Sequence, residues 1–351
     1  MSGVSPDCIS VDIFYEAKPA WPETLVPRLS GQAGFASIKV IEMPYAALVE
    51  KFTGSIAPEH TTIYRHPQHI LIFGGPAGVG DAFKVDASCR HVLINKAYEL
   101  RHPLASSFII PESYPEWNLA DGYHNLVEFE LDAGYLARAI VLIVETAGSI
   151  AELGSFCMDE TLRKRLLVVI KQEYVRAADS FIYHGPIKLI KKDTNDFSVC
   201  AVDHIGKPME FGDEVIHVLD ALDGKLKTEA HKPKFSSEQE RDRFLLIADL
   251  VDLFRALLIS EIQSLLDFFG IKIEKSRLNQ MIWQLKLFNL IQEIQVYEKI
   301  YFVAFKGKDH QLLDYTAPEN QKNFSRPGFK ALVQSAILKD QKRRKAIEQG
   351  R

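Results

Sequence analysis

The amino-acid sequence predicts an α/β protein: a flavodoxin-like, doubly wound parallel sheet with a C-terminal winged-helix (α+β) domain. Six consecutive apolar residues, Ala139–Val144, four of them β-branched, are typical of a strand that is buried on both faces. Other short apolar runs alternate with helical patterns on either side of it, as in a parallel sheet with right-handed crossovers. Farther along the chain, two helical runs precede an alternating hairpin pattern, which favours a winged helix.

The composition is that of a soluble globular protein with two domains. The chain has 351 residues, 47% hydrophobic and 25% charged, and its net charge is −4. A protein that mainly binds bare DNA is usually basic, so we expect any nucleic-acid contact to be local or to pass through a partner. No apolar run reaches the ~20 residues of a membrane span, and the first residues lack a signal-peptide pattern. The scattered cysteines indicate reduced thiols in a cytoplasmic protein, with neither a disulfide framework nor a zinc site.

Residues 1–65 are predicted to be an N-terminal extension of the α/β domain. Ser37–Glu42 alternates weakly, as a short strand would. The extension could pack on the α/β domain, cover its site or hold a partner. His66 and His69 have a spacing that metal sites use on helices, but they straddle Pro67 just before a strand, so we predict no metal there.

A glycine-rich turn follows the first strand of the α/β domain, His69–Phe73. Gly74, Gly75 and Pro76 open this turn, and glycines there let a ligand approach the backbone closely. The spacing matches neither Gly-x-Gly-x-x-Gly nor a P-loop, so it predicts neither a dinucleotide fingerprint nor a kinase-type phosphate loop. A flexible turn without a ligand is the alternative.

The second strand ends beside an acidic residue. A helix over Ala87–Leu100 leads to a strand over Ser106–Ile110, and Glu112 follows that strand. The carboxyl ends of parallel strands share one edge of a sheet, so we expect Glu112 on the same edge as the glycine turn.

The central strand runs into a turn that carries two more acids. Glu145 follows the strand, Gly148 lies in the turn, and a helix is predicted to start at Ser149. A helix start after a strand suits phosphate or carboxylate groups. Ser149-x-x-Glu152 also has the spacing of a capping box, which gives Glu152 an alternative, purely structural role. A helix over Asn125–Arg138, which contains Glu130, precedes the strand.

The C-terminal part is predicted to begin after a linker, residues 206–235, that is rich in Asp, Gly, Lys and Pro. Ser237-x-x-Glu240 would cap a helical run to about Phe269. A second helix, Lys275 to about Leu290, precedes a hairpin over Glu293–Phe305. This second helix could contact DNA or dock a protein, through the polar side chains of Lys275, Arg277, Gln280, Gln284 and Lys286.

The tail is predicted to hold one more amphipathic helix. Phe329, Leu332, Val333, Ala336 and Ile337 recur at helical spacing. The most basic stretch of the chain comes next, Lys342-Arg-Arg-Lys345, and is read either as a solvated tail or as a phosphate contact. The predicted organisation is therefore an extension (1–65), a catalytic domain (66–205), a linker (206–235), a winged-helix-like domain (236–316) and a helical basic tail (317–351).

The motif from Glu145 to Phe156, Glu-x-x-Gly-Ser-x-x-Glu-Leu-Gly-x-Phe, resembles the nucleoside 2-deoxyribosyltransferase-like superfamily. Within it, the chain is most similar to retron-associated effectors, toxins encoded beside a reverse transcriptase in bacterial anti-phage retrons. The resemblance runs from about Ile70 to about Val199. Its further motifs are Ile72-Phe-Gly-Gly75, Ile110-Pro-Glu112, Leu162-Arg-Lys-Arg-Leu166 and Ser180-Phe-Ile-Tyr-His-Gly-Pro-Ile-Lys-Leu189. The chain departs from the family at Arg138, where members usually carry an aspartate.

The resemblance implies an N-glycosidase site. Glu152 would be the nucleophile, and Glu145 would position ribose hydroxyls or assist proton transfer. The other substrate contacts would come from Gly74, Gly75, Pro76, Glu112, Glu130, Gly148 and Ser149. The resemblance implies no metal and no cofactor, because NAD or a nucleotide would be the substrate.

The function that the resemblance implies is a toxin for anti-phage defence by abortive infection, with NAD hydrolysis as the first expectation. Action on nucleotides or deoxynucleotides is the close alternative. The implied partners are the retron reverse transcriptase and its RNA–DNA product (msDNA), bound directly or through the reverse transcriptase, and further copies of the chain in a homo-oligomer. A hypothesis from another class is a non-catalytic module that senses a nucleotide while its winged helix binds DNA.

Overall fold

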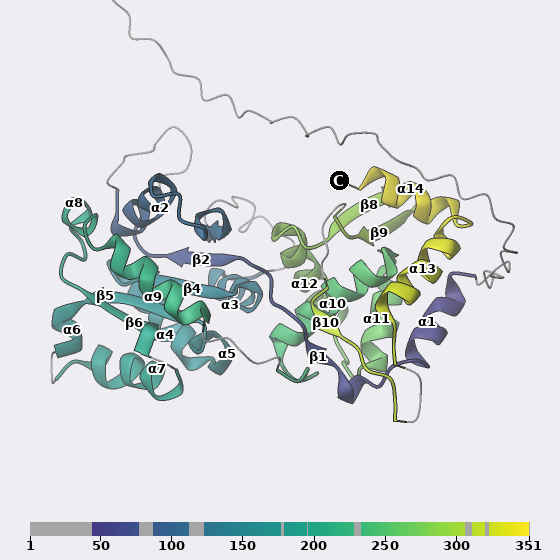
Figure 1. The fold of residues 1–351 in the computed structure, drawn as a ribbon, viewed down its shortest axis with the longest axis horizontal. Coiled ribbons are helices and arrows are strands. Elements are labelled where there is room, and N and C mark those ends of the chain that lie inside the picture. Colours follow the sequence, from purple (N-terminus) through teal and green to yellow (C-terminus); the bar gives the residue numbers. More distant parts are fainter. Residues whose placement is uncertain are drawn as a thin grey trace, which may run out of the picture. The chain divides into compact units, whose positions relative to one another are not determined.

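A five-stranded parallel sheet carries the α/β part of the protein (Figure 1). The computed structural model describes residues 44–76, 87–111, 123–176, 179–194, 196–227, 233–305, 311–319 and 323–350. The strands are β2 (Ile70–Phe73), β3 (Phe108–Ile109), β4 (Ala139–Ile143), β5 (Leu166–Lys171) and β6 (Val199–Val202). Their spatial order is β3-β2-β4-β5-β6, and every neighbouring pair is parallel. In chain order this is 2-1-3-4-5, so the predicted flavodoxin-like topology is confirmed.

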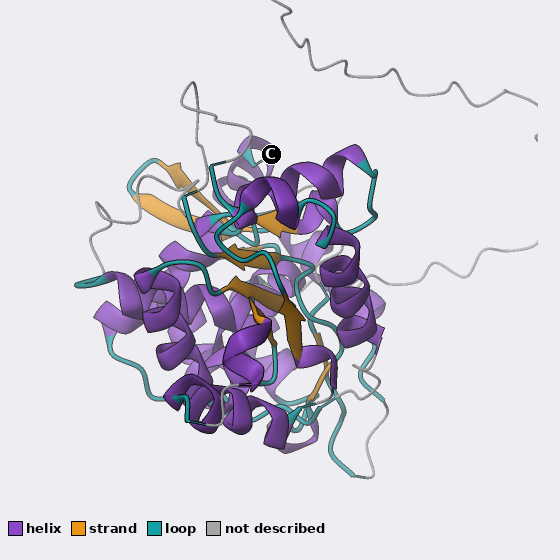
Figure 2. Ribbon diagram, turned by 90° about the vertical axis from the view of Figure 1, so that its left-hand side faces the viewer, coloured by secondary structure: helices purple, strands orange, loops and turns teal. Residues whose placement is uncertain are grey.

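Helices cover both faces of this sheet (Figure 2). On one face, α2 (Cys89–Glu99) and α9 (Val215–Lys227) share a core with the strand residues Ile70, Ile72 and Val141. On the other face, α3 (Leu126–Leu136) and α4 (Ala147–Met158) pack against Leu71, Phe73 and Leu142. The strands alternate between the two cores because successive side chains of a strand point to opposite faces. The shorter helices of this part are α5 (Glu160–Arg163), α6 (Gln172–Arg176), α7 (Lys188–Asp193) and α8 (Pro208–Phe211).

The predicted linker is wrong over residues 208–227, which form α8 and α9. Helix α9 buries one apolar face on the sheet, formed by Val215, Val218, Leu219, Leu222 and Leu226. These residues follow helical spacing, but the surrounding Asp, Gly and Lys residues hid the pattern. Residues 228–232 lie outside the described part of the chain, as does the weak strand expected at Ser37–Glu42.

The C-terminal part has the element order and sheet order of the predicted winged helix. Its elements are α10 (Glu240–Phe254), β7 (Ala256–Leu257), α11 (Ile259–Phe268), α12 (Lys275–Leu287), β8 (Gln292–Val296) and β9 (Lys299–Val303). The antiparallel strands follow the order β7-β9-β8.

Two details of the prediction for this part are wrong. The helical run does not continue to Phe269, because Arg255 has a positive φ of 66°, which ends α10 and lets β7 form. Ser237 does not cap α10 either. The helix starts at Glu240 after Gln239, which makes no side-chain cap.

Segments from both ends of the described chain pack on the winged helix. Helix α1 (Ala46–Thr53) inserts Phe52 among the rings of Phe254 and Tyr315, with centroid distances of 5.4 and 5.2 Å. Strand β1 (Thr62–Ile63) pairs antiparallel with β10 (Leu313–Asp314), and α13 (Arg326–Ile337) and α14 (Gln341–Gln349) follow. The described part of the N-terminal extension therefore lies on the C-terminal helices.

Helix α14 packs through Arg343, so the interpretation of its basic stretch as a solvated tail is wrong for this one residue. Arg343 is buried, stacks 3.5 Å over the ring of Tyr45, and forms an ion pair with Glu261 at 2.5 Å. Its guanidinium group also donates to the backbone oxygen of Ala256. Arg343 is thus a structural residue, while Lys342 and Lys345 remain exposed. Among the described helices, none is long and apolar enough to cross a membrane.

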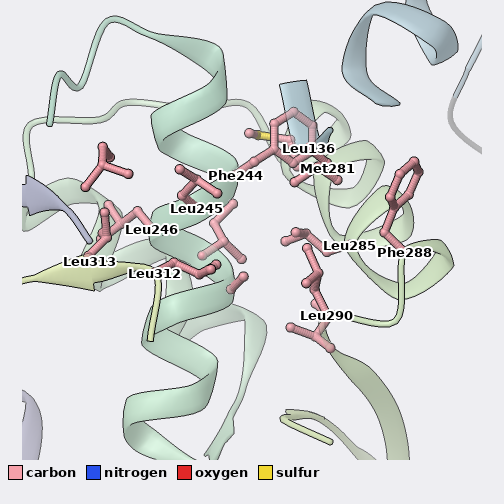
Figure 3. Packing of buried hydrophobic residues seen from close by; sticks show 14 of the residues in the cluster. Leu136, Phe244, Leu245, Leu246, Met281, Leu285, Phe288, Leu290, Leu312 and Leu313 are labelled. Atoms are coloured by element: carbon pink, nitrogen blue, oxygen red, sulfur yellow. The ribbon is translucent and has the colours of Figure 1, made fainter. Parts of the chain in front are cut away.

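One hydrophobic core joins the α/β part to the winged helix. Leu136 of α3 lies beside Phe244 of α10 and Met281 of α12 (Figure 3). At the edge of this contact, Arg277 of α12 donates to both carboxylate oxygens of Asp132 of α3, at 2.5 and 2.7 Å. Asp132 is 3% exposed and also accepts a hydrogen bond from Tyr123. The face of α12 that was considered for DNA contact is therefore partly used inside the chain: Arg277 binds Asp132, and Gln284 is fully buried.

The Asp132–Arg277 pair should contribute to folding. Asp132→Asn leaves the Arg277 cation half-buried without its main carboxylate, so we expect the free energy of unfolding to fall by about 3 kcal/mol. Urea denaturation measures this loss. Glu160→Gln, which breaks the exposed Lys164–Glu160 pair, is the control and should cost less than about 1 kcal/mol. Equal effects of the two substitutions would contradict the assignment.

His66 should make folding depend on pH. Burial, and next the guanidinium groups of Arg165, Arg241 and Arg138, lower the pKa of His66 to about 2. Below pH ~6.5 the unfolded chain therefore binds a proton that the folded chain does not, so stability falls as the pH falls. Between pH 6.5 and 5, His66→Gln should lose less stability than the wild type, by up to about 1.4 kcal/mol per pH unit. Parallel stability curves for the two proteins would refute this.

Candidate active site

A ligand site is expected between the carboxyl ends of β2 and β4, because the helices that follow these two strands pack on opposite faces of the sheet. The chain leaves β2 for α2 on one face and leaves β4 for α4 on the other. This divergence is the topological switch point at which open α/β sheets bind ligands. Gly74 and Gly75 follow β2, and Glu145 lies two residues after β4, so three of the predicted site residues meet at this point.

The carboxylate of Glu145 connects the two strand ends. It accepts hydrogen bonds from the backbone nitrogen atoms of Gly75 at 2.7 Å, Cys89 at 2.8 Å and Arg90 at 3.1 Å. Cys89 and Arg90 are the first residues of α2, where a negative charge is stabilised by free N–H groups and by the helix dipole. Glu145 therefore holds the glycine turn and the start of α2 in place, which makes it a positioning residue in this structure.

The two glycines are required for this close approach. A Cβ atom on Gly75 would lie 2.8 Å from the Ser88 Cβ and 2.9 Å from the carboxylate carbon of Glu145. Gly74 has a φ of 155°, and a Cβ there would lie 3.0 Å from a Glu145 oxygen. Pro76 continues the turn, and its carbonyl oxygen accepts a hydrogen bond from the Ser88 hydroxyl.

Helix α4 starts two residues earlier than predicted, and its capping box is a different one. Thr146 is the N-cap; its hydroxyl accepts from the Ser149 nitrogen at 3.1 Å, and the Ser149 hydroxyl accepts from the Thr146 nitrogen at 2.9 Å. The predicted box between Ser149 and Glu152 is therefore wrong, because Ser149 is the third residue of the helix rather than its cap. Ser149 is fully buried and serves the turn. The structural alternative for Glu152, that it caps the helix, no longer applies.

Glu152 is half-buried on α4, one turn beyond the cap. Side chains on a helix lean toward its N-terminus, so Glu152 leans over the turn that holds Gly148, four residues earlier. Gly148 is exposed, and a Cβ there would meet only the Thr146 hydroxyl, at 3.7 Å. The rings of Phe73 and Phe156, 5.0 Å apart, fix α4 over the end of β2.

Two further predicted site residues remain predictions. Glu112 lies outside the described residues. Glu130 is half-buried on α3, and its part in the site stays a prediction.

Sequence reasoning missed Arg90, which is 2% exposed and lies against the glycine turn. Its guanidinium group donates to the carbonyl oxygen of Ile72 at 3.3 Å, and its Cβ lies 3.1 Å from the position of a Cβ on Gly74. A cation in the first turn of a helix opposes the helix dipole, and this was the available signal. Burial, and next the charge of Glu145, raise the pKa of the neighbouring Cys89 thiol to about 12, so this cysteine is protonated and a poor nucleophile.

Comparison with known proteins identifies the family. The STM3845 retron effector protein family matches residues 86–293, which is more than half of the chain. The chain belongs to this retron effector family.

Two Escherichia coli proteins are similar to part of this chain. The "Retron Ec73 putative ribosyltransferase/DNA-binding protein" is 37% identical over 82 residues, which are 23% of this chain and 25% of that protein. The "Retron Ec86 putative ribosyltransferase/DNA-binding protein" is 31% identical over 100 residues, which are 27% of this chain and 32% of that protein. The similarity thus spans a third or less of either relative.

The positioning role of Glu145 gives a direct prediction. Glu145→Gln replaces one acceptor oxygen by an NH2 group that faces backbone N–H donors, so we expect a loss of about 2 kcal/mol in the free energy of unfolding. Glu298→Gln serves as the matched control, since it changes the same side-chain type on the exposed turn between β8 and β9, and should cost less than about 0.5 kcal/mol. Urea denaturation of both variants measures the difference. An equal or larger loss for Glu298→Gln would contradict the positioning role of Glu145.

Proposed function

We propose that this retron effector is an N-glycosidase of the nucleoside 2-deoxyribosyltransferase-like superfamily, with Glu152 as its nucleophile and NAD as its substrate. The observation that carries the proposal is the Thr146–Ser149 capping box. It satisfies the start of α4 without Glu152, so a carboxylate remains beside the switch point with no part in the helix cap. The family match supports the retron context, and the names of the two relatives support ribosyl chemistry.

The proposed reaction breaks the bond between C1′ of the ribose and the leaving nitrogen. Positive charge develops on C1′, and the Glu152 carboxylate stabilises it or attacks C1′ to form a glycosyl ester. The bond electrons stay with the leaving nitrogen. Water then attacks C1′ and releases Glu152 as a carboxylate, and one proton enters solution.

The hydrogen bonds of Glu145 favour NAD over nucleotides as the substrate. Both oxygen atoms of its carboxylate accept hydrogen bonds from backbone N–H groups, so Glu145 serves as an acceptor that holds the turn, and a general acid would have to be another residue. Nicotinamide leaves NAD as a neutral ring and needs no proton. A purine or pyrimidine base leaves far more easily when it is protonated, so a nucleotide or deoxynucleotide substrate would require a general acid.

The non-catalytic alternative, a nucleotide sensor that reads DNA through the second helix of its winged helix, has less support. That helix, α12, holds Arg277 in ion pairs with Asp132 and Glu240, and Gln284 is buried in the core. Base reading requires side chains that are free to enter the groove of a duplex. In the retron context, we propose that the reverse transcriptase and its msDNA restrain the enzyme in the cytoplasm until phage infection.

The experiment that tests the proposal is NAD turnover by the full chain, alone and with its retron reverse transcriptase complex. Glu152→Gln should lower kcat at least about 1000-fold with an unchanged melting temperature, because the amide cannot act as a nucleophile. Glu298→Gln, on the turn between β8 and β9, is the control and should leave turnover unchanged. Turnover of NAD by Glu152→Gln at the wild-type rate would refute the nucleophile assignment, and turnover of nucleotides in place of NAD would refute the substrate.

A further inference from the structure

The loop after β6 carries a histidine on the same edge of the sheet as the candidate active site. This loop, residues 203–207, follows the carboxyl end of β6 and leads into α8, and its Ile205 packs against the core that α2 and α9 share. The Cys89 thiol, at the start of α2, donates to the backbone oxygen of His204 at 3.7 Å, while the Cys89 nitrogen donates to Glu145 at 2.8 Å. Because both contacts belong to one residue, the backbone of His204 lies within about 10 Å of the Glu145 carboxylate.

Glu214 holds both this loop and the His204 ring. Its carboxylate accepts hydrogen bonds from the backbone nitrogen atoms of Asp203 at 2.8 Å and His204 at 3.1 Å. One of its oxygen atoms also lies 3.5 Å from Nδ1 of His204. Nδ1 is buried, whereas 41% of the His204 side chain is exposed, so the exposed part is the rest of the ring, which carries Nε2. A carboxylate beside Nδ1 favours the tautomer with its proton there, which leaves Nε2 able to accept a proton.

Glu152 and His204 belong to segments that pack on opposite faces of the sheet. Glu152 is part of α4, which packs on one face, whereas α2 and the His204 loop pack on the other. A reaction that passes through a glycosyl ester needs two such sides. The nucleophile attacks C1′ from one face of the ribose, the leaving group departs from the opposite face, and water enters where the leaving group was. A base that activates this water must therefore come from the side of α2.

Few described side chains on the α2 side can act as that base. The carboxylates of Glu145 and Glu214 already accept backbone N–H groups and hold their own turns. The Cys89 thiol is protonated, because burial and the nearby charge of Glu145 raise its pKa to about 12. The imidazole of His204 has the chemistry of a general base, since imidazoles take up and release protons near neutral pH. Asp203, exposed on the same loop, is the competing candidate.

We propose that His204 is the general base for hydrolysis of the glycosyl ester, with Glu214 as its positioning residue. The inference rests on the proposed function, in which Glu152 forms this ester. The water oxygen attacks C1′, the ester bond between C1′ and the Glu152 oxygen breaks, and its electron pair stays with Glu152 as a carboxylate. Nε2 of His204 takes one proton from the water and later passes it to solvent. The charge of Glu214 stabilises the imidazolium that forms in between. Nicotinamide leaves without a proton, so the first step does not use His204.

The test follows nicotinamide release from NAD by rapid-quench kinetics, with the full chain and its retron reverse transcriptase complex. His204→Gln should release a burst of one nicotinamide per active site at the wild-type rate and then turn over about 100-fold more slowly, with an unchanged melting temperature. Intact-mass spectrometry should find the ADP-ribosyl ester on this variant. Azide attacks C1′ without losing a proton, so it should restore fast turnover. Glu214→Gln should show the same burst with a smaller loss in the later rate.

The matched control is His102→Gln, since His102 lies 3.6 Å from the Asp223 carboxylate but at the opposite edge of the sheet, between α2 and β3. It should turn over NAD like the wild type, and so should Asp203→Asn. Equal steady rates for His204→Gln and the wild type, or slow turnover confined to Asp203→Asn, would overturn this inference alone. So would a His204→Gln variant that loses the burst and does not respond to azide. No nicotinamide release by the wild type would refute the proposed function, and this inference with it.

Discussion

The site depends on one carboxylate that three backbone N–H groups surround. Glu145 lies after the central strand, and its partners belong to the turn after β2 and to the start of α2. These segments are far apart in the sequence, and a flavodoxin-like strand order brings them together. The close approach in turn requires Gly75, where a side chain would collide with Ser88 and with Glu145. Strand order, glycine turn and helix start are therefore parts of one constraint, which fixes the backbone at the switch point between β2 and β4.

Local signals in the sequence predicted the fold well where one residue pattern decides the structure. Ala139–Ile143 became a fully buried strand, because a continuous apolar run suits a strand between two helical layers. The break at Arg255 was not predictable, since only the backbone conformation of one non-glycine residue marks it. The hydrogen bonds that Glu145 accepts from Gly75, Cys89 and Arg90 could not be predicted either. They join residues 55 to 70 positions apart, and no spacing rule predicts such contacts.

Charge was the weakest guide to structure in this chain. Basic residues that suggested nucleic-acid contact, Arg277 and Arg343, turned out to hold helices together through ion pairs with Asp132 and Glu261. An arginine is equally suited to an internal carboxylate and to a phosphate, so sequence composition alone does not separate the two roles.

The packing of α1 against α13 has a consequence for the timing of synthesis. Phe52 and Phe329 belong to one aromatic cluster, with ring centroids 5.5 Å apart, although 277 positions separate them in the chain. A ribosome must therefore translate the message as far as Phe329 before the core of the winged helix can close. Contacts of such long range slow folding, because a large loop must form before they stabilise the chain. A cell that makes this effector consequently has an interval during translation in which the nascent protein is not yet fully folded.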